Sequence, residues 1–198
     1  DVYKRQDAHL ANAKQVVAWL VEDQRIAYVN YAGLEDHPHH ERAKKLLPLG
    51  VGSVFSFGVK ATEKASGRLV GGEFIGALQL ASHLANIGDA RTLVLHPGST
   101  THQQLTAEQL AAGGVGEDLI RISVGLEDVE DIIWDLDQAL TYATGLNHTG
   151  ERVGESSADK VVEAEEAVAA AKAAEDAAAA EAAAGASCSL PTTTQEEK

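Results

Sequence analysis

Apolar and polar positions along residues 1–150 alternate in runs that predict both helices and strands. Residues 8–22 carry apolar side chains every three or four positions, which predicts an amphipathic helix. Runs rich in β-branched and aromatic residues predict strands at residues 25–31, 52–60, 91–96 and 119–124. Further helices are predicted at residues 38–47, 71–85 and 106–113, and a last one from about Asp128. We therefore expect an α+β fold, in which about four largely antiparallel strands form a sheet with helices over one face.

The last predicted helix carries one signal at its start and another along its length. Acidic residues crowd its first turn, where they complement the positive end of the helix dipole. Apolar residues then recur at helical spacing. We expect Ile132, Ile133 and Leu136 to pack on the sheet.

The pattern changes near residue 150, beyond which alanine and glutamate dominate and aromatic residues vanish. This composition has high helix propensity, but only Val161, Val162 and Val168 offer bulk that a core could bury. We place a boundary near Thr149. The segment beyond it is expected to be a solvated helix or a linker without chemistry of its own.

Charge and composition exclude several classes of function. The net charge is −14, and residues 1–150 carry 19 acidic and 12 basic side chains while residues 151–198 carry 11 and 4. Neither part has the basic surface that nucleic acid requires. No apolar run approaches the roughly 20 residues that cross a bilayer, and the lone Cys188 excludes an intramolecular disulfide. We expect a soluble, cytoplasmic protein with no nucleic-acid or membrane partner.

Two clusters have only part of a functional pattern. His37, His39 and His40 lack the cysteine or second histidine pair of a zinc site, and adjacent helical residues point apart. Lys60 and Lys64 lie among glycines, but the residue order of a phosphate-binding loop is missing and no apolar enclosure suits a cofactor-linked lysine. We expect a solvated helix start at the histidines and a surface loop at residues 58–72, with no metal ligand and no cofactor-binding residue in the chain.

The loop that follows the strand at residues 91–96 is polar and has two interpretations. Ser99, Thr100 and Thr101 suit a ligand-binding loop, because loops at strand ends often carry function. Their hydroxyls equally suit the capping of turns and helices. The residues alone favour neither.

Arg121 is a cation in the middle of an otherwise apolar strand. A buried or half-buried guanidinium needs a partner, and its planar fork suits a carboxylate best. That carboxylate could belong to the protein, at Glu117, Asp118 or Glu127, or to a ligand held rigidly at the strand end. The pattern does not decide between the two.

Four segments together resemble one enzyme family. They read HLANAKQVVAWL from His9, VNYAGLEDHPHHERAKKLLPLGVGSVFSFGVK from Val29, LASHLANIGDARTLVLHPGSTTHQQL from Leu80 and DLIRISVGLEDVEDIIWDLDQAL from Asp118. In this order they are similar to the C-terminal domain of the pyridoxal-phosphate-dependent enzymes of cysteine and methionine metabolism. The Ala-Asn-Ile-Gly-Asp sequence that includes Asn86 resembles the sulfhydrylase branch of that family.

The resemblance implies a fold, a site and a reaction. The fold is the small C-terminal domain of a pyridoxal-phosphate transferase of the aspartate aminotransferase type, fold type I. Arg121 takes the place of the arginine that binds the substrate α-carboxylate, and Asn86 and Ile87 line the same pocket. The implied cofactor is pyridoxal phosphate, the substrates are O-acetyl-L-homoserine and sulfide, and the implied assembly is a homotetramer.

The resemblance also divides the chain. Residues 7–145 correspond to the substrate-clamping domain, whereas residues 1–6 and the acidic tail at residues 146–198 have no counterpart in the family pattern. The family's large domain carries the lysine that binds the cofactor, and that domain is not in this chain. We expect the chain to be a fragment of the enzyme, without catalytic residues of its own and inactive alone.

Two other interpretations stay open. The chain could belong to a cystathionine γ-synthase, a cystathionine γ-lyase or a methionine γ-lyase, all relatives within the same family. It could also be a non-catalytic interaction module that keeps the fold and uses its acidic tail to bind a partner.

Overall fold

The structure, a computed structural model, describes residues 2–100, 104 and 107–186. The chain forms two compact units, residues 1–160 and residues 161–198. The sheet and the helices that pack on it belong to the first unit. The finer division at residues 1–6, 7–145 and 146–198 stays a prediction.

The first unit is built on a five-stranded sheet in the order β1-β2-β5-β4-β3. Three neighbouring pairs, β1 with β2, β2 with β5 and β5 with β4, are antiparallel, and β3 runs parallel to β4. The predicted α+β fold with a largely antiparallel sheet is confirmed. The fifth strand, β3, escapes prediction because two residues are too few to show a pattern. The strands are β1 (Ile26–Asn30), β2 (Val54–Val59), β3 (Ser82–His83), β4 (Leu93–Leu95) and β5 (Leu119–Ser123).

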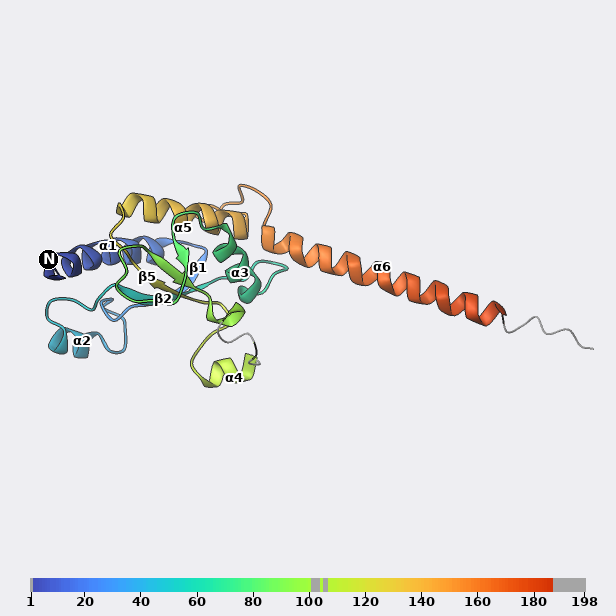
Figure 1. The fold of residues 1–198 in the computed structure, drawn as a ribbon, viewed down its shortest axis with the longest axis horizontal. Coiled ribbons are helices and arrows are strands. Elements are labelled where there is room, and N and C mark those ends of the chain that lie inside the picture. The colour runs from blue at the N-terminus through green and yellow to red at the C-terminus, as the bar shows by residue number, and fades with distance from the viewer. Residues whose placement is uncertain (1, 101–103, 105–106, 187–198) are drawn as a thin grey trace, which may run out of the picture. The chain divides into compact units, whose positions relative to one another are not determined.

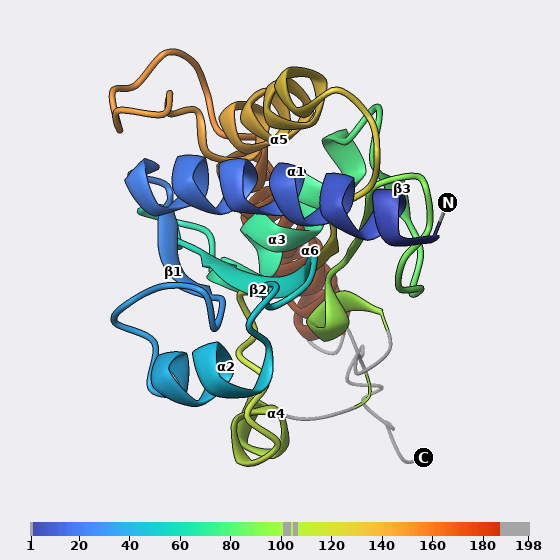
Figure 2. The same cartoon turned by 90° about the vertical axis from the view of Figure 1, so that its left-hand side faces the viewer.

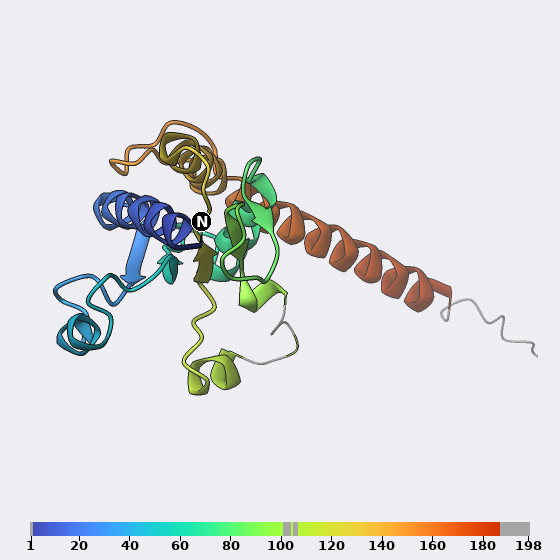
Figure 3. The same ribbon diagram turned by 60° about the vertical axis from the view of Figure 1, so that its left-hand side comes forward.

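Helices cover one face of this sheet more fully than the other. Helices α1 (Val2–Glu22), α3 (Gly67–Ala77) and α5 (Val129–Thr144) pack over one face, while α2 (His40–Leu46) and α4 (Ala107–Ala112) lie on the other side (Figures 1, 2 and 3). Alternate strand residues such as Phe57, Ile120 and Ile122 are fully buried. The ring of Phe57 meets that of Phe74 on α3 edge to face, 6.2 Å between centroids. The core therefore lies between this sheet face and the three helices.

Helix α5 begins and ends at well-formed caps. The Asp128 carboxylate accepts from the amide of Glu130 at 2.9 Å, and Gly145 closes the helix with φ 70°. Ile132 and Leu136 are each 1% exposed, and α5 packs against α3 and α1, so their expected packing on the sheet itself stays a prediction. Ile133 is half-buried, because the helical rotation turns it toward the edge of the packed face.

Helix α3 differs from the prediction at both ends. It begins at Gly67, because the Ser66 hydroxyl accepts from the amide of Leu69 at 3.4 Å, so the expected surface loop at residues 58–72 is wrong from Gly67 onward. It ends at Ala77, not at residue 85. The Asp135 carboxylate of α5 accepts hydrogen bonds from the amides of residues 79–81 and so holds them outside the helical ladder.

A buried arginine ties the N-terminal helix and first strand to α5. The guanidinium of Arg25 is 1% exposed, donates to Asp23 and Asp137 at 2.5 and 2.6 Å, and also bonds the Thr141 hydroxyl at 2.8 Å. Burial lowers the pKa of Arg25, but the hydrogen bonds to the two carboxylates outweigh it and leave that pKa above its ordinary value. No local sequence pattern predicts this cluster, which we call the Arg25 cluster.

Helix α6 (Ser157–Ala186) forms most of the alanine-rich region that the structure describes. Residues 163–174 are exposed throughout, in line with a solvated helix. No helix in the described part of the chain is both long enough and apolar enough to span a membrane. Cys188 lies outside the described residues.

Candidate functional site

The pleat of β5 places Arg121 on the sheet face opposite the core. Its neighbours Ile120 and Ile122 are fully buried against the helices, so Arg121 points the other way and is half-buried. Directly opposite residues of paired strands share a face, and Arg121 lies between Ser56 of β2 and Leu95 of β4. The arginine is thus held on a rigid strand with a hydroxyl beside it.

Ser56 is a neighbour that the sequence interpretation missed. It stands between two buried phenylalanines in β2, just as Arg121 stands between two buried isoleucines in β5. Asn30 of β1 lies opposite Ser56 and extends the same row. A polar residue inside each of three apolar strands was the available signal, but only strand register shows that the three side chains align.

The structure also brings Asn86 to Arg121. The guanidinium Nη2 of Arg121 donates to the main-chain carbonyl of Asn86 at 3.4 Å, while the Asn86 side chain accepts from the amide of Ile87 at 2.9 Å. Ile87 is 66% exposed on the same segment. Of the predicted site residues, the structure therefore brings Asn86 to Arg121 through its backbone and not its side chain, and Ile87 is the next residue along the chain.

Two carboxylates hold the segment that carries Asn86, one at each end of the segment. Asp135, 1% exposed, accepts from the amides of residues 79–81 at 2.8 to 3.0 Å. Glu127 accepts from the amide and the hydroxyl of Thr92 at 2.6 and 2.9 Å. Bonds to an ionised acceptor are short and strong, so the segment is fixed at both ends although its middle is exposed. We call residues 79–92 the strap.

Arg121 makes no ion pair with any described residue. Three carboxylates in the sequence could have paired with Arg121. One of them, Glu127, accepts hydrogen bonds from Thr92. Glu117 and Asp118 form no hydrogen bond or ion pair with the guanidinium either. One long bond to a carbonyl leaves most of the five N–H donors without a partner in the described part of the protein.

The loop after β4 uses its first hydroxyls internally. Ser99 Oγ lies 2.8 Å from Nδ1 of His96, and the Thr100 hydroxyl donates to the His96 carbonyl at 2.8 Å. His96 is fully buried, and its Nε2 lies 2.8 Å from the Glu117 carbonyl. The capping interpretation holds for Ser99 and Thr100, whereas Thr101 lies outside the described residues.

The histidines of the second predicted helix serve the local turn. Nε2 of His37 lies 2.8 Å from the Asn30 side-chain oxygen, and its Nδ1 accepts from the amide of His39 at 3.1 Å. Within the described residues no three histidine, cysteine or acidic side chains are grouped closely enough to hold a metal ion.

A lysine that binds a cofactor covalently needs an enclosed site that lowers its pKa. Every lysine whose side chain the structure describes is exposed, and Lys60 donates to the Gln24 carbonyl at 2.7 Å. The described residues therefore do not supply the amine of a pyridoxal phosphate site. What they do supply is a half-buried cation, Arg121, on strand β5.

Residues 3–141 match the family described as Cys/Met metabolism PLP-dependent enzymes. The chain is 47% identical over 136 residues to O-acetyl-L-homoserine sulfhydrylase 1 of Thermus thermophilus, covering 69% of this chain and 31% of that protein. It is 46% identical over 140 residues to the homocysteine/cysteine synthase of Saccharomyces cerevisiae, covering 68% of this chain and 32% of that protein.

A solved structure with a similar fold carries a similar name. A crystal structure described as an O-acetylhomoserine (thiol)-lyase from Campylobacter jejuni, with an N′-pyridoxyl-lysine-5′-monophosphate, superposes with a TM-score of 0.62 at 34% identity. The match covers 70% of this chain and 32% of that one. The chain thus spans about a third of the length of the relatives that it matches.

Proposed function

The chain belongs to the pyridoxal-phosphate-dependent enzymes of cysteine and methionine metabolism, and from this premise we propose that it is the substrate-clamping part of an O-acetyl-L-homoserine sulfhydrylase. The complete enzyme replaces the acetoxy group of O-acetyl-L-homoserine by sulfide, forming homocysteine and releasing acetate. Pyridoxal phosphate, when bound to the complete enzyme, supplies the electron sink. In this proposal the enzyme is a cytoplasmic homotetramer.

One observation carries the proposal: Arg121 is half-buried and has no carboxylate partner among the described residues. A substrate α-carboxylate satisfies the guanidinium fork through two parallel hydrogen bonds. The rigid strand around Arg121 then fixes the amino acid in one orientation, which lowers the entropic part of the reaction barrier. The proposal assigns this clamping role to Arg121.

In this proposal, the strap forms the second side of the substrate site at Arg121. Asn86 accepts from one edge of the guanidinium, so the other edge is left for the substrate. Ile87 presents an exposed apolar side chain that suits the methylene chain of the amino acid. Asp135 and Glu127 act only through the strap and are positioning residues in this proposal.

A chimera tests the function, because the chain spans only part of its relatives. Residues 3–141 replace the matching segment of the Thermus thermophilus enzyme, and the parent enzyme is the control. We expect sulfide-dependent formation of homocysteine from O-acetyl-L-homoserine. A folded chimera with bound cofactor that forms cystathionine from L-cysteine but no homocysteine from sulfide would contradict the sulfhydrylase and favour a cystathionine γ-synthase.

A further inference from the structure

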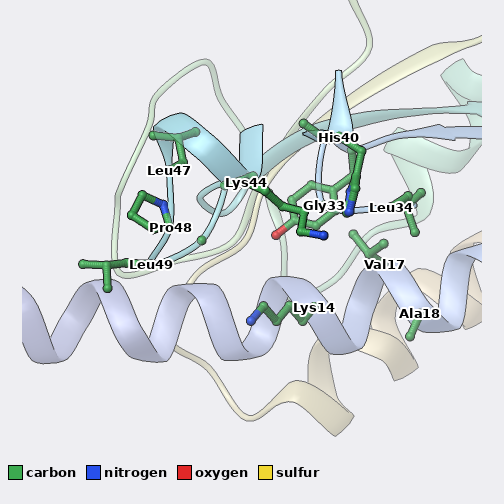
Figure 4. Close-up of a pocket in the computed structure, with 14 residues that line it drawn as sticks. Lys14, Val17, Ala18, Gly33, Leu34, His40, Lys44, Leu47, Pro48 and Leu49 are labelled. Carbon is green, nitrogen blue, oxygen red and sulfur yellow. The ribbon is translucent and has the colours of Figure 1, made fainter. Parts of the chain in front are cut away.

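A cavity of about 520 Å³ lies between helix α1 and the segment at residues 31–51 (Figure 4). Sites for small molecules are usually concave and have volumes of roughly 300–1,000 Å³. Neither Arg121 nor the strap lines this cavity. It is therefore separate from the candidate substrate site.

The walls of the cavity are mostly apolar. Val17 comes from α1, Leu34 from the turn after β1, and Leu47 and Leu49 from the end of α2 and the following loop. The Tyr31 hydroxyl donates to the Gly52 carbonyl at 3.1 Å, so this residue's hydroxyl is already used. Leu49 is 92% exposed and Leu47 is 50% exposed at the rim. Two uncovered leucines beside a hollow form an apolar surface that a ligand can cover.

The ionisable groups that line the cavity are all basic, apart from the Tyr31 hydroxyl. Lys14 of α1 and Lys44 of α2 contribute amines, His40 contributes an imidazole, and the lining holds no aspartate or glutamate. Figure 4 shows Lys44 reaching from α2 toward α1. In a chain of net charge −14, such a group of cations without a lining acid is a local exception.

These basic groups have few partners of their own. Lys14 has no ion pair within the described residues, and Lys44 lies 3.6 Å from Glu41 with both side chains largely in solvent. Nδ1 of His40 is buried and has no hydrogen-bond partner in the described structure. The two lysine amines are therefore the groups that a ligand in the cavity can pair with.

We propose that this cavity binds a small amphipathic anion, a molecule with one carboxylate and an apolar body. The carboxylate lies between the amines of Lys14 and Lys44, while the body covers Val17, Leu34 and Leu49. Charge complementarity selects the anion, and burial of the rim leucines favours an apolar body over a simple inorganic ion.

The test is a titration of the 198-residue chain with 4-phenylbutyrate, followed by two-dimensional amide NMR. We expect saturable shifts confined to residues 14–18 and 31–51. Lys14→Gln combined with Lys44→Gln should weaken binding about tenfold or more, since charge-assisted hydrogen bonds to both amines are lost. The neutral isostere 4-phenylbutanol should bind about tenfold more weakly than the acid.

Lys45→Gln is the matched control, because Lys45 neighbours Lys44 on α2 but does not line the cavity. It should bind like the unaltered chain, and thermal melting of all variants should show that each is folded. Equal affinity for the acid and the alcohol would overturn the proposal, as would a Lys45→Gln effect equal to that of the double variant. Absence of saturable shifts, together with a Leu49→Asp change that turns a dimer into a monomer, would show a copy-to-copy contact in its place.

The site and the proposed sulfhydrylase are independent. Neither Arg121 nor the strap lines the cavity, so the lysine substitutions leave the candidate substrate site unchanged. Each proposal can therefore fail without the other.

Discussion

Two arginines in this fold are used in opposite ways. Arg25 is 1% exposed and donates to two carboxylates, a hydroxyl and two carbonyl oxygens. Arg121 is half-buried and has a single 3.4 Å bond to a carbonyl oxygen among the described residues. A guanidinium whose donors are all satisfied holds the fold together, whereas one whose fork is open on a rigid strand is ready for a ligand.

The charged groups around the two arginines also differ. Around Arg25, Asp23 is fully buried and the Trp19 ring lies 6.0 Å from the guanidinium carbon, stacked in turn on His148. Glu127, one of the carboxylates that the sequence offers to Arg121, accepts hydrogen bonds from Thr92 of the strap. Two carboxylates thus neutralise Arg25, whereas Arg121 has no carboxylate partner among the described residues. Substitutions at the arginines and their neighbours separate the two roles.

The largest effect is expected from Arg25→Ala. It leaves the buried Asp23 carboxylate without its cation, and breaking a buried ion pair in this way costs about 3–5 kcal/mol of unfolding free energy. Urea denaturation measures the loss. Arg42→Ala on the exposed face of α2 is the control and should change stability by less than about 0.5 kcal/mol. A cost for Arg25→Ala as small as that of the control would remove the contrast between the arginines.

Asp135→Asn should have an intermediate effect that is concentrated on the strap. The neutral amide loses charge-assisted bonds to the amides of residues 79–81, each worth about 1.5–3 kcal/mol when an ion is involved. Hydrogen exchange of those amides should quicken while exchange in β2 stays slow. Asp131→Asn, exposed on the same helix, serves as control. Unaltered exchange at residues 79–81 would show that the carboxylate does not fix the strap.

A smaller effect is expected from pH through His96. Desolvation by burial lowers the pKa of His96 below its ordinary value of 6.5, although the hydrogen bond to the Glu117 carbonyl opposes this. The unfolded chain then binds the proton more readily, so stability is complete above pH 6.5 and falls as the pH drops below it. Between about pH 6.5 and 5.5 this loss is at most about 1.4 kcal/mol.

The measurement for His96 is the unfolding free energy at about pH 7.5 and about pH 5.5 in the wild type and in His96→Gln. The variant should lose less stability on acidification than the wild type. Identical pH dependence in both proteins would mean that His96 is not the group responsible.

The periodic pattern predicts most of this fold, and the end of one helix shows where it fails. Strand β5 and helix α5 follow from local periodicity, because each buries one face along its own length. The end of α3 does not, since Asp135, far along the chain, removes its last amides from the helix. Effects carried by distant side chains leave no local signal.

The candidate site was predictable only in part for the same reason. Arg121 is conspicuous as a cation in an apolar strand, and the family pattern adds Asn86 and Ile87. Ser56 joins them through strand register alone. Arg25 looks in sequence like an ordinary residue at the start of a strand, and nothing local shows that it is the more deeply buried arginine.

The most direct test of the contrast is Arg121→Lys in the chimera with the Thermus thermophilus enzyme, with stability and turnover measured on the same preparation. Lysine keeps the charge and loses the paired geometry, so kcat/KM for O-acetyl-L-homoserine should fall by the equivalent of about 1.5–3 kcal/mol. The unfolding free energy should change by less than about 0.5 kcal/mol, because Arg121 pairs with no described carboxylate. Wild-type kcat/KM in a destabilised Arg121→Lys protein would contradict the clamping role and make Arg121 a second structural arginine.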